Sequence, residues 1–83
     1  MSTYAEVQRR FASRLEAFRE QLGLTKRQFA WRCGITIHNY DYYTNKGGMP
    51  NLYTAMVIAE RLGLTLDQMI GTRGDKTNGK DRV

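Results

Sequence analysis

One phrase occurs twice in the 83-residue sequence, as LGLTKRQ at residues 22–28 and as LGLTLDQ at residues 62–68. In both copies a glycine stands where a helix can end in the left-handed conformation. Two residues later a threonine can cap the next helix, and a glutamine three residues further on can close a capping box. The repeated phrase therefore predicts two tight corners between helices, so the chain is constrained to fold into short helical segments.

Helical spacing of apolar residues extends on both sides of the first corner. The predicted first helix begins at a capping box of Thr3 and Glu6, and Gly23 ends it. The second runs from near Thr25 to Gly34, and the third from the cap at Thr36 to about Asn45. The apolar face of the first helix is formed by Val7, Phe11, Leu15, Phe18 and Leu22.

The remaining helices follow a glycine-containing loop at residues 46–48. The fourth helix follows Pro50 and Asn51, and the fifth begins near Thr65. We expect the core face of the fourth helix to be Leu52, Ala55, Ala59 and Leu62. The sequence thus predicts an all-α, five-helix bundle over residues 1–71, in which the second and third helices form a helix-turn-helix. Residues 72–83 are predicted to be a disordered polar tail.

Composition narrows the classes of function. The net charge is +5 and the pI is about 9.7, which favours an anionic partner. A single Cys and a single His exclude an internal disulfide and a metal cluster, and the scattered acidic residues indicate no catalytic set. The longest apolar run, residues 55–59, is too short to span a membrane, and no signal peptide is evident. We therefore expect a cytoplasmic protein that is not an enzyme and needs no cofactor or metal.

The predicted helix-turn-helix resembles the lambda-repressor-like, Cro-type (XRE) family over about residues 5–71. The family has a small residue in the second helix and a glycine in the turn, and this sequence supplies Ala30 and Gly34. Residues 50–69 are similar to the family's fourth and fifth helices. The apolar positions of the family pattern are occupied by Phe29, Cys33, Ile35, Tyr40 and Tyr43, of which we expect Cys33, Tyr40 and Tyr43 to be buried.

The resemblance implies a sequence-specific DNA-binding regulator of a bacterium or phage, a repressor that binds palindromic DNA as a dimer. The third helix would lie in the major groove of double-stranded DNA. Base contacts would come from Ile37, His38, Asn39 and Tyr42. Phosphate contacts would come from Thr25, Lys26, Arg27, Gln28, Asn45, Lys46 and Gly47. No small-molecule ligand and no membrane contact is implied.

Three features favour an alternative, in which the same fold binds a protein as an antitoxin, anti-repressor or inhibitor. Residues 33–45 contain no Lys or Arg, Asp41 lies within the third helix, and Trp31 occupies a place usually given to an exposed polar residue. Asp41 is expected to face solvent or Lys46. The arginines of the first helix, interleaved with Glu6, Glu16 and Glu20, are interpreted as a mixed-charge solvent face. Candidate interface residues for a partner or a second copy are Trp31, Leu66, Met69 and Ile70.

Overall fold

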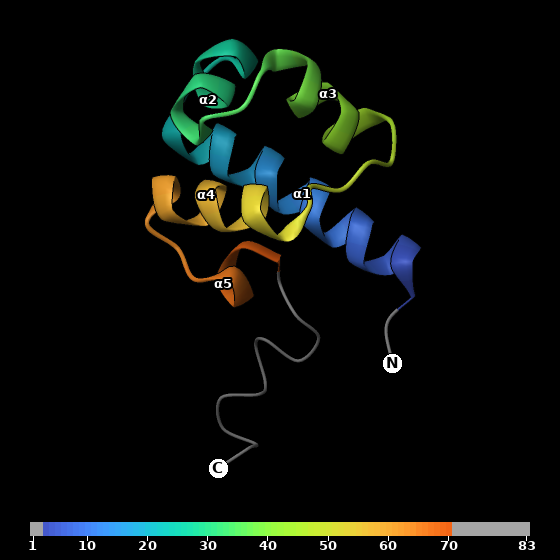
Figure 1. Cartoon of the computed structure of the whole chain (residues 1–83). Helices are drawn as coiled ribbons and strands as arrows, with labels where there is room; N and C mark the ends of the chain where they lie inside the picture. Colours follow the sequence, from blue (N-terminus) through green and yellow to red (C-terminus); the bar gives the residue numbers. More distant parts are fainter. Residues whose placement is uncertain (1–2, 71–83) are drawn as a thin grey trace.

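The computed structural model of the chain describes residues 3–70, and all five predicted helices are present in this range (Figure 1). They are α1 (Tyr4–Leu22), α2 (Lys26–Cys33), α3 (Ile37–Asn45), α4 (Leu52–Leu62) and α5 (Leu66–Ile70). In Figure 1, α1 crosses the middle of the molecule, with α2 and α3 above it and α4 and α5 below. α1 packs against α3 and α5, while α2 packs against α3 and α4. The predicted tail at 72–83 lies outside the described residues, so its structure and the domain boundary at residue 71 stay predictions.

The two copies of the repeated phrase form the same corner. At the first corner Gly23 adopts φ +70°, and the Leu24 amide donates to the Arg19 carbonyl at 3.2 Å. Thr25 and Gln28 then form a reciprocal capping box, with bonds of 2.9 and 3.1 Å. At the second corner Gly63 adopts φ +72°, and the pair Thr65 and Gln68 repeats the box at 2.9 and 3.0 Å. The prediction of one capping device used twice is confirmed.

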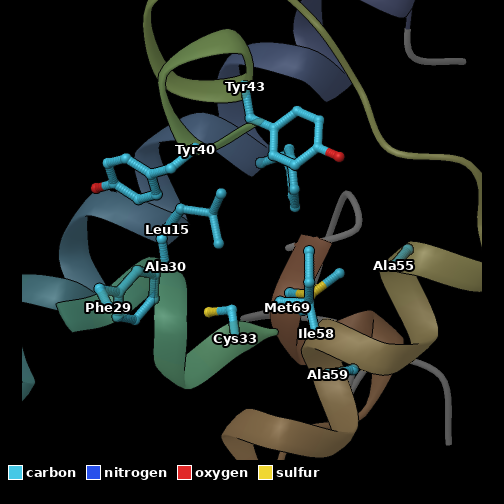
Figure 2. Packing of buried hydrophobic residues seen from close by; sticks show 11 residues of the cluster. Leu15, Phe29, Ala30, Cys33, Tyr40, Tyr43, Ala55, Ile58, Ala59 and Met69 are labelled. Carbon is cyan, nitrogen blue, oxygen red and sulfur yellow. The ribbon is translucent and has the colours of Figure 1, made fainter. Parts of the chain in front are cut away.

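A single cluster of buried side chains joins all five helices (Figure 2). Phe11 of α1 meets Tyr43 edge to face, with ring centroids 5.6 Å apart, and Phe29 of α2 meets Tyr40 at 5.7 Å. Each such pair contributes about 0.5–1.5 kcal/mol beyond the burial of its area. α3 is therefore held from its inner face by aromatic contacts to both α1 and α2. The cluster consists of Phe11, Leu15, Phe29, Ala30, Cys33, Tyr40, Tyr43, Ala55, Ile58, Ala59 and Met69.

The predicted burial of Cys33, Tyr40 and Tyr43 is confirmed, because all three side chains are at most 5% exposed. Burial raises the pKa of the Cys33 thiol to about 12, so the reactive thiolate is disfavoured at neutral pH. Cys33 is accordingly a packing residue.

Two expected core residues are not in the core. Leu52 is 68% exposed, because it is the first residue of α4 and side chains on a helix lean toward its N-terminus. Its side chain therefore lies beyond the buried turns, and the buried residues of α4 are Ala55, Ile58 and Ala59. Leu22, at the last residue of α1, is 46% exposed and lines a shallow surface groove with Phe18 and Leu64.

Candidate nucleic-acid interface

The outer face of α3 carries the four residues predicted to contact bases. His38 and Asn39 are exposed, Tyr42 is 50% exposed, and Ile37 is partly buried. Tyr40 and Tyr43 point the other way, into the core (Figure 2). Because the inward tyrosines fix the rotation of the helix, the side chains of His38 and Asn39 in its first turn face away from the bundle.

The first turn of α3 is capped by the side chain of Thr36 and not by its own outward side chains. Thr36 accepts a hydrogen bond from the Asn39 amide through its hydroxyl, at 3.0 Å. Within residues 3–70 no hydrogen bond engages the imidazole of His38 or the side-chain amide of Asn39. These side chains consequently keep their donors and acceptors available for a ligand.

Tyr42 is positioned by a glycine that the sequence reasoning did not single out. The Gly48 amide donates to the Tyr42 carbonyl at 2.9 Å, and the Tyr42 ring lies directly on the Gly48 α-carbon. A β-carbon added at Gly48 would overlap three carbon atoms of that ring. Gly48 is buried, so the ring rests on backbone that only a glycine leaves open. The pair of glycines at 47–48 in the sequence indicated a loop but not this contact.

Asp41 binds two of the residues predicted to contact phosphate. Its carboxylate accepts a hydrogen bond from the Asn45 side chain at 2.6 Å and lies 3.8 Å from the Lys46 ammonium. The expectation that Asp41 faces either solvent or Lys46 is met by this ion pair at the surface, where the Asp41 and Lys46 side chains are 46% and 65% exposed. An exposed pair of this kind is worth only about 0–1 kcal/mol, so Lys46 can leave it for a stronger anion at little cost.

The loop after α3 is fastened to the first turns of α1. The Gln8 side-chain amide donates to two carbonyls, those of Tyr43 at 2.7 Å and Gly48 at 2.9 Å, and the Tyr4 hydroxyl donates to the Gly47 carbonyl at 2.9 Å. Gln8 is only 8% exposed. These contacts of Tyr4 and Gln8 with the loop were not predicted from the sequence. Gln8 lies three positions before Phe11 on the buried face of α1, and a polar residue at such a position indicates a buried hydrogen bond.

The N-terminus of α2 presents the second predicted group of phosphate contacts. Thr25, Lys26, Arg27 and Gln28 are all exposed. The capping box satisfies the amides of Thr25 and Gln28, which leaves the amides of Lys26 and Arg27 without a partner in the helix. The positive end of the helix dipole and two free amides thus lie beside two cationic side chains, which is an arrangement that attracts anions.

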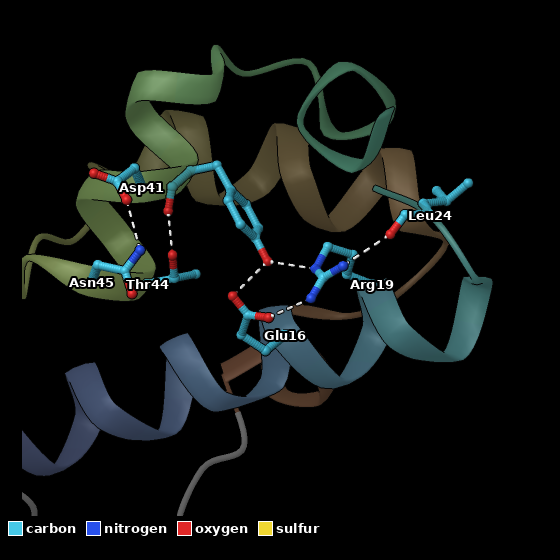
Figure 3. Close-up of polar contacts among 7 residues, drawn as sticks. Glu16, Arg19, Leu24, Asp41, Thr44 and Asn45 are labelled. Atoms are coloured by element: carbon cyan, nitrogen blue, oxygen red, sulfur yellow. Dashed lines mark hydrogen bonds and ion pairs between the residues drawn. The ribbon is translucent and has the colours of Figure 1, made fainter. Parts of the chain in front are cut away.

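A partly buried polar network joins α1, the corner before α2, and α3 (Figure 3). The Tyr40 hydroxyl donates to Glu16 at 2.8 Å and accepts from Arg19 at 3.1 Å, while Arg19 also donates to the Leu24 carbonyl at 3.0 Å. Arg19 and Glu16 form an ion pair at 3.0 Å. The interpretation of these two residues as part of a solvent face is therefore wrong, because both turn toward Tyr40. Burial raises the pKa of Tyr40, and its hydrogen bond to Glu16 adds to that shift.

The candidate interface residues at the C-terminal end of the described chain are directed into the core. Met69 is 0% exposed, and Leu66 and Ile70 pack against the buried cluster. The proposed role of Met69 as a partner surface is wrong, because its side chain is enclosed by the bundle. Trp31 is in the opposite situation, since it is 81% exposed on the outer side of α2.

Other kinds of site find little support in residues 3–70. No group of three His, Cys, Asp or Glu side chains in this range could hold a metal ion. None of the helices described there is both long enough and apolar enough to cross a membrane.

The comparisons with known proteins agree with the arrangement of the helices. A family model of the helix-turn-helix domain, of the Cro/C1 type, matches residues 15–69, from the middle of α1 into α5. The match covers more than half of the chain and includes both corners. Searches of curated proteins and of solved structures found no match.

Proposed function

Because the chain belongs to the Cro/C1-type (XRE) helix-turn-helix family, we propose that it is a sequence-specific transcriptional regulator, with repression as its mode of action. Membership supports a DNA-binding helix-turn-helix regulator, and the family is typically non-enzymatic. The single observation that carries the finer proposal is the outward first turn of α3, whose polar side chains have no partner in the described chain.

In this proposal the first turn of α3 enters the major groove and reads base edges. His38 donates to a guanine acceptor, and Asn39 pairs with adenine through both atoms of its amide. Ile37 contacts a thymine methyl group, while Tyr42, held on Gly48, bonds to a base edge or to the adjacent phosphate. Each good pair of hydrogen bonds to a base discriminates against the wrong base by about 1–3 kcal/mol.

Two groups of residues bind the phosphate backbone of the DNA and fix this helix in the groove; we call them the phosphate grips. One is the N-terminus of α2, where the free amides and the side chains of Lys26 and Arg27 bind phosphate, flanked by Thr25 and Gln28. The other is the loop at Asn45, Lys46 and Gly47, which Tyr4 and Gln8 hold in place. These contacts position the protein but do not read sequence. Lys46 exchanges its weak pair with Asp41 for a phosphate.

Two protomers are proposed to bind one palindromic site, with one half-site per protomer and about one helical turn between half-sites. Because Met69 is buried, the contact between protomers does not use its side chain.

Selection of binding sites from a random duplex DNA pool, followed by affinity measurements across a salt series, tests this proposal. We expect an enriched site with two-fold symmetry and a log–log salt slope of about −4 to −5 for each protomer, as contact with about five phosphates requires. Absence of enrichment and of salt-dependent binding would refute it.

Two variants separate base reading from phosphate binding. His38→Ala should reduce the preference for the selected site over random DNA, while Lys46→Ala should weaken binding to all sequences alike. Arg9→Ala is the matched control for Lys46→Ala, because Arg9 is an exposed cation on α1 outside both grips. A Lys46→Ala protein that loses only its sequence preference would contradict the assigned roles.

A further inference from the structure

The outer side of α2 carries an open groove that includes Trp31, a residue that the proposed DNA contacts do not use. The groove has a volume of about 740 Å³. Trp31 forms one wall of it, and 81% of this residue's surface is exposed. The inward face of α2 is already filled by Phe29, Ala30 and Cys33, so Trp31 adds nothing to the core. The residues that line this Trp31 groove are Leu24, Arg27, Gln28, Trp31 and Arg32.

The polar groups around the groove are all hydrogen-bond donors. Arg27 and Arg32 lie on either side of Trp31 in sequence, and within residues 3–70 no carboxylate pairs with either guanidinium. The carbonyl oxygen of the Gln28 side chain already accepts a hydrogen bond from the Thr25 amide at 2.9 Å, so the group that this side chain can still offer to a ligand is its NH2 donor. α2 contains no acidic residue. A complementary ligand therefore presents carboxylates together with an apolar side chain that covers the indole.

Two other occupants do not match this chemistry. A second copy docked through the same face would place the arginines of both copies against one another. Residues 71–83 of the chain contain four basic and two acidic residues and a single apolar residue, Val83, so they lack both the charge and the apolar anchor. The exterior of a DNA duplex presents phosphates and deoxyribose rings, but no apolar side chain that could fill the groove beside the indole.

We propose that the Trp31 groove docks an acidic segment of a protein partner, with one apolar side chain against Trp31 and carboxylates paired to Arg27 and Arg32. Trp31 and Arg32 belong to neither of the proposed phosphate grips. Arg27 and Gln28, in contrast, are shared with the proposed phosphate contacts at the N-terminus of α2, so a partner bound at this groove leaves the first turn of α3 exposed but competes with DNA for Arg27. Variants at Trp31 and Arg32 therefore test the groove separately from the DNA-binding proposal.

The lone tryptophan of the chain provides the readout, since any ligand in the groove changes the environment of Trp31 directly. Three synthetic peptides of about 15 residues serve as probes. The first is acidic with leucine and phenylalanine at helical spacing, the second replaces its acidic residues by lysine, and the third replaces its apolar residues by serine. We expect the first to shift Trp31 emission to the blue and to bind at least about tenfold more tightly than the other two.

Variants of the full chain then assign the site. Trp31→Ala and Arg32→Gln should each weaken binding of the labelled acidic–apolar peptide by about tenfold or more, measured by anisotropy. Tyr53→Ala is the matched control, because Tyr53 is an aromatic residue of α4 that is 75% exposed, and it should leave peptide affinity unchanged. Far-UV circular dichroism verifies that each variant is folded, which the exposure of these side chains leads us to expect.

Two results would overturn the proposal. One is an absence of saturable binding of the acidic–apolar peptide up to about 1 mM, or equal binding of the acidic and lysine peptides. The other is a Trp31→Ala protein that loses DNA affinity as severely as Lys46→Ala does, since the groove would then belong to the DNA interface.

Discussion

At the scale of single residues, the contact between Tyr42 and Gly48 links the shape of the loop to the recognition helix. The Tyr42 ring occupies the space that any side chain at position 48 would need, and the Tyr42 carbonyl accepts a hydrogen bond from the Gly48 amide. A tyrosine that is half exposed would otherwise sample several rotamers. Gly48 therefore favours the one in which the Tyr42 ring lies on the backbone of residue 48.

We predict that Gly48→Ala destabilises the protein by about 1–3 kcal/mol, as overpacking does, and weakens DNA binding by displacing the Tyr42 ring. The same substitution in a Tyr42→Ala background should cost less than about 0.5 kcal/mol, because the overlapping ring is absent. Urea unfolding of the four proteins measures this coupling. An equal loss in both backgrounds would show that the backbone at residue 48, rather than the ring, resists the added methyl group.

At the scale of elements, the first turns of α1 act as a support for the loop that follows α3. Tyr4 and Gln8 reach residues that are 35 to 43 positions away in sequence and bind three carbonyl groups there. The loop is thereby fixed relative to α3, whose C-cap residue is Lys46 with φ −119° and not a glycine. The grip at Lys46 depends on α1 for its position.

Gln8→Met should remove this support while keeping a side chain of similar volume. The carbonyls of Tyr43 and Gly48 lose their buried donor, at a cost of about 1–3 kcal/mol. We expect faster amide exchange at Lys46 and Gly48, and weaker DNA binding with an unchanged preference among sequences. Gln21→Met, at an exposed position of the same helix, is the control. Unaltered exchange at Lys46 and Gly48 in Gln8→Met would mean that the loop is held by other contacts.

The helices were predictable because their boundaries depend on residues close in sequence. Thr25 and Gln28 lie three residues apart, so the capping box they form is visible in the sequence itself. The hydrogen bonds of Gln8 to the Tyr43 and Gly48 carbonyls and the network around Tyr40 depend on packing between helices, which no local pattern specifies. The exposure of Leu52 was missed for a related reason, since helical spacing shows which residues share a face but not how far along the helix that face is covered.

At the scale of the whole molecule, the network of Glu16, Arg19 and Tyr40 couples stability to pH. Burial alone would raise the pKa of Glu16, but hydrogen bonds from Arg19 and Tyr40 outweigh it, so the pKa is lowered from its ordinary value of 4.5. Because the folded state favours the carboxylate, its contribution to the free energy of unfolding is present above pH 4.5. The contribution is lost as the pH falls from there through the folded-state pKa.

We therefore predict that Glu16→Gln lowers the melting temperature at neutral pH and that the difference from the parent protein narrows toward about pH 3. Thermal melts by circular dichroism across this range measure it. Glu20→Gln, which removes a carboxylate at an exposed position of the same helix outside this network, is the matched control. A gap for Glu16→Gln that stays constant down to acid pH would show that the carboxylate's charge makes no contribution through this network.

The two matching corners have a consequence for how this fold can be modified. Both corners keep Thr and Gln three residues apart, and the two residues between them differ. They are Lys26 and Arg27 in the first copy and Leu66 and Asp67 in the second. The capping box forms in both copies, with two cations between Thr and Gln in the first and an anion in the second. It therefore does not depend on the sign of the charge at these positions. Affinity for a polyanion can accordingly be adjusted, or reversed, at residues 26 and 27 while the scaffold around them is left as it is.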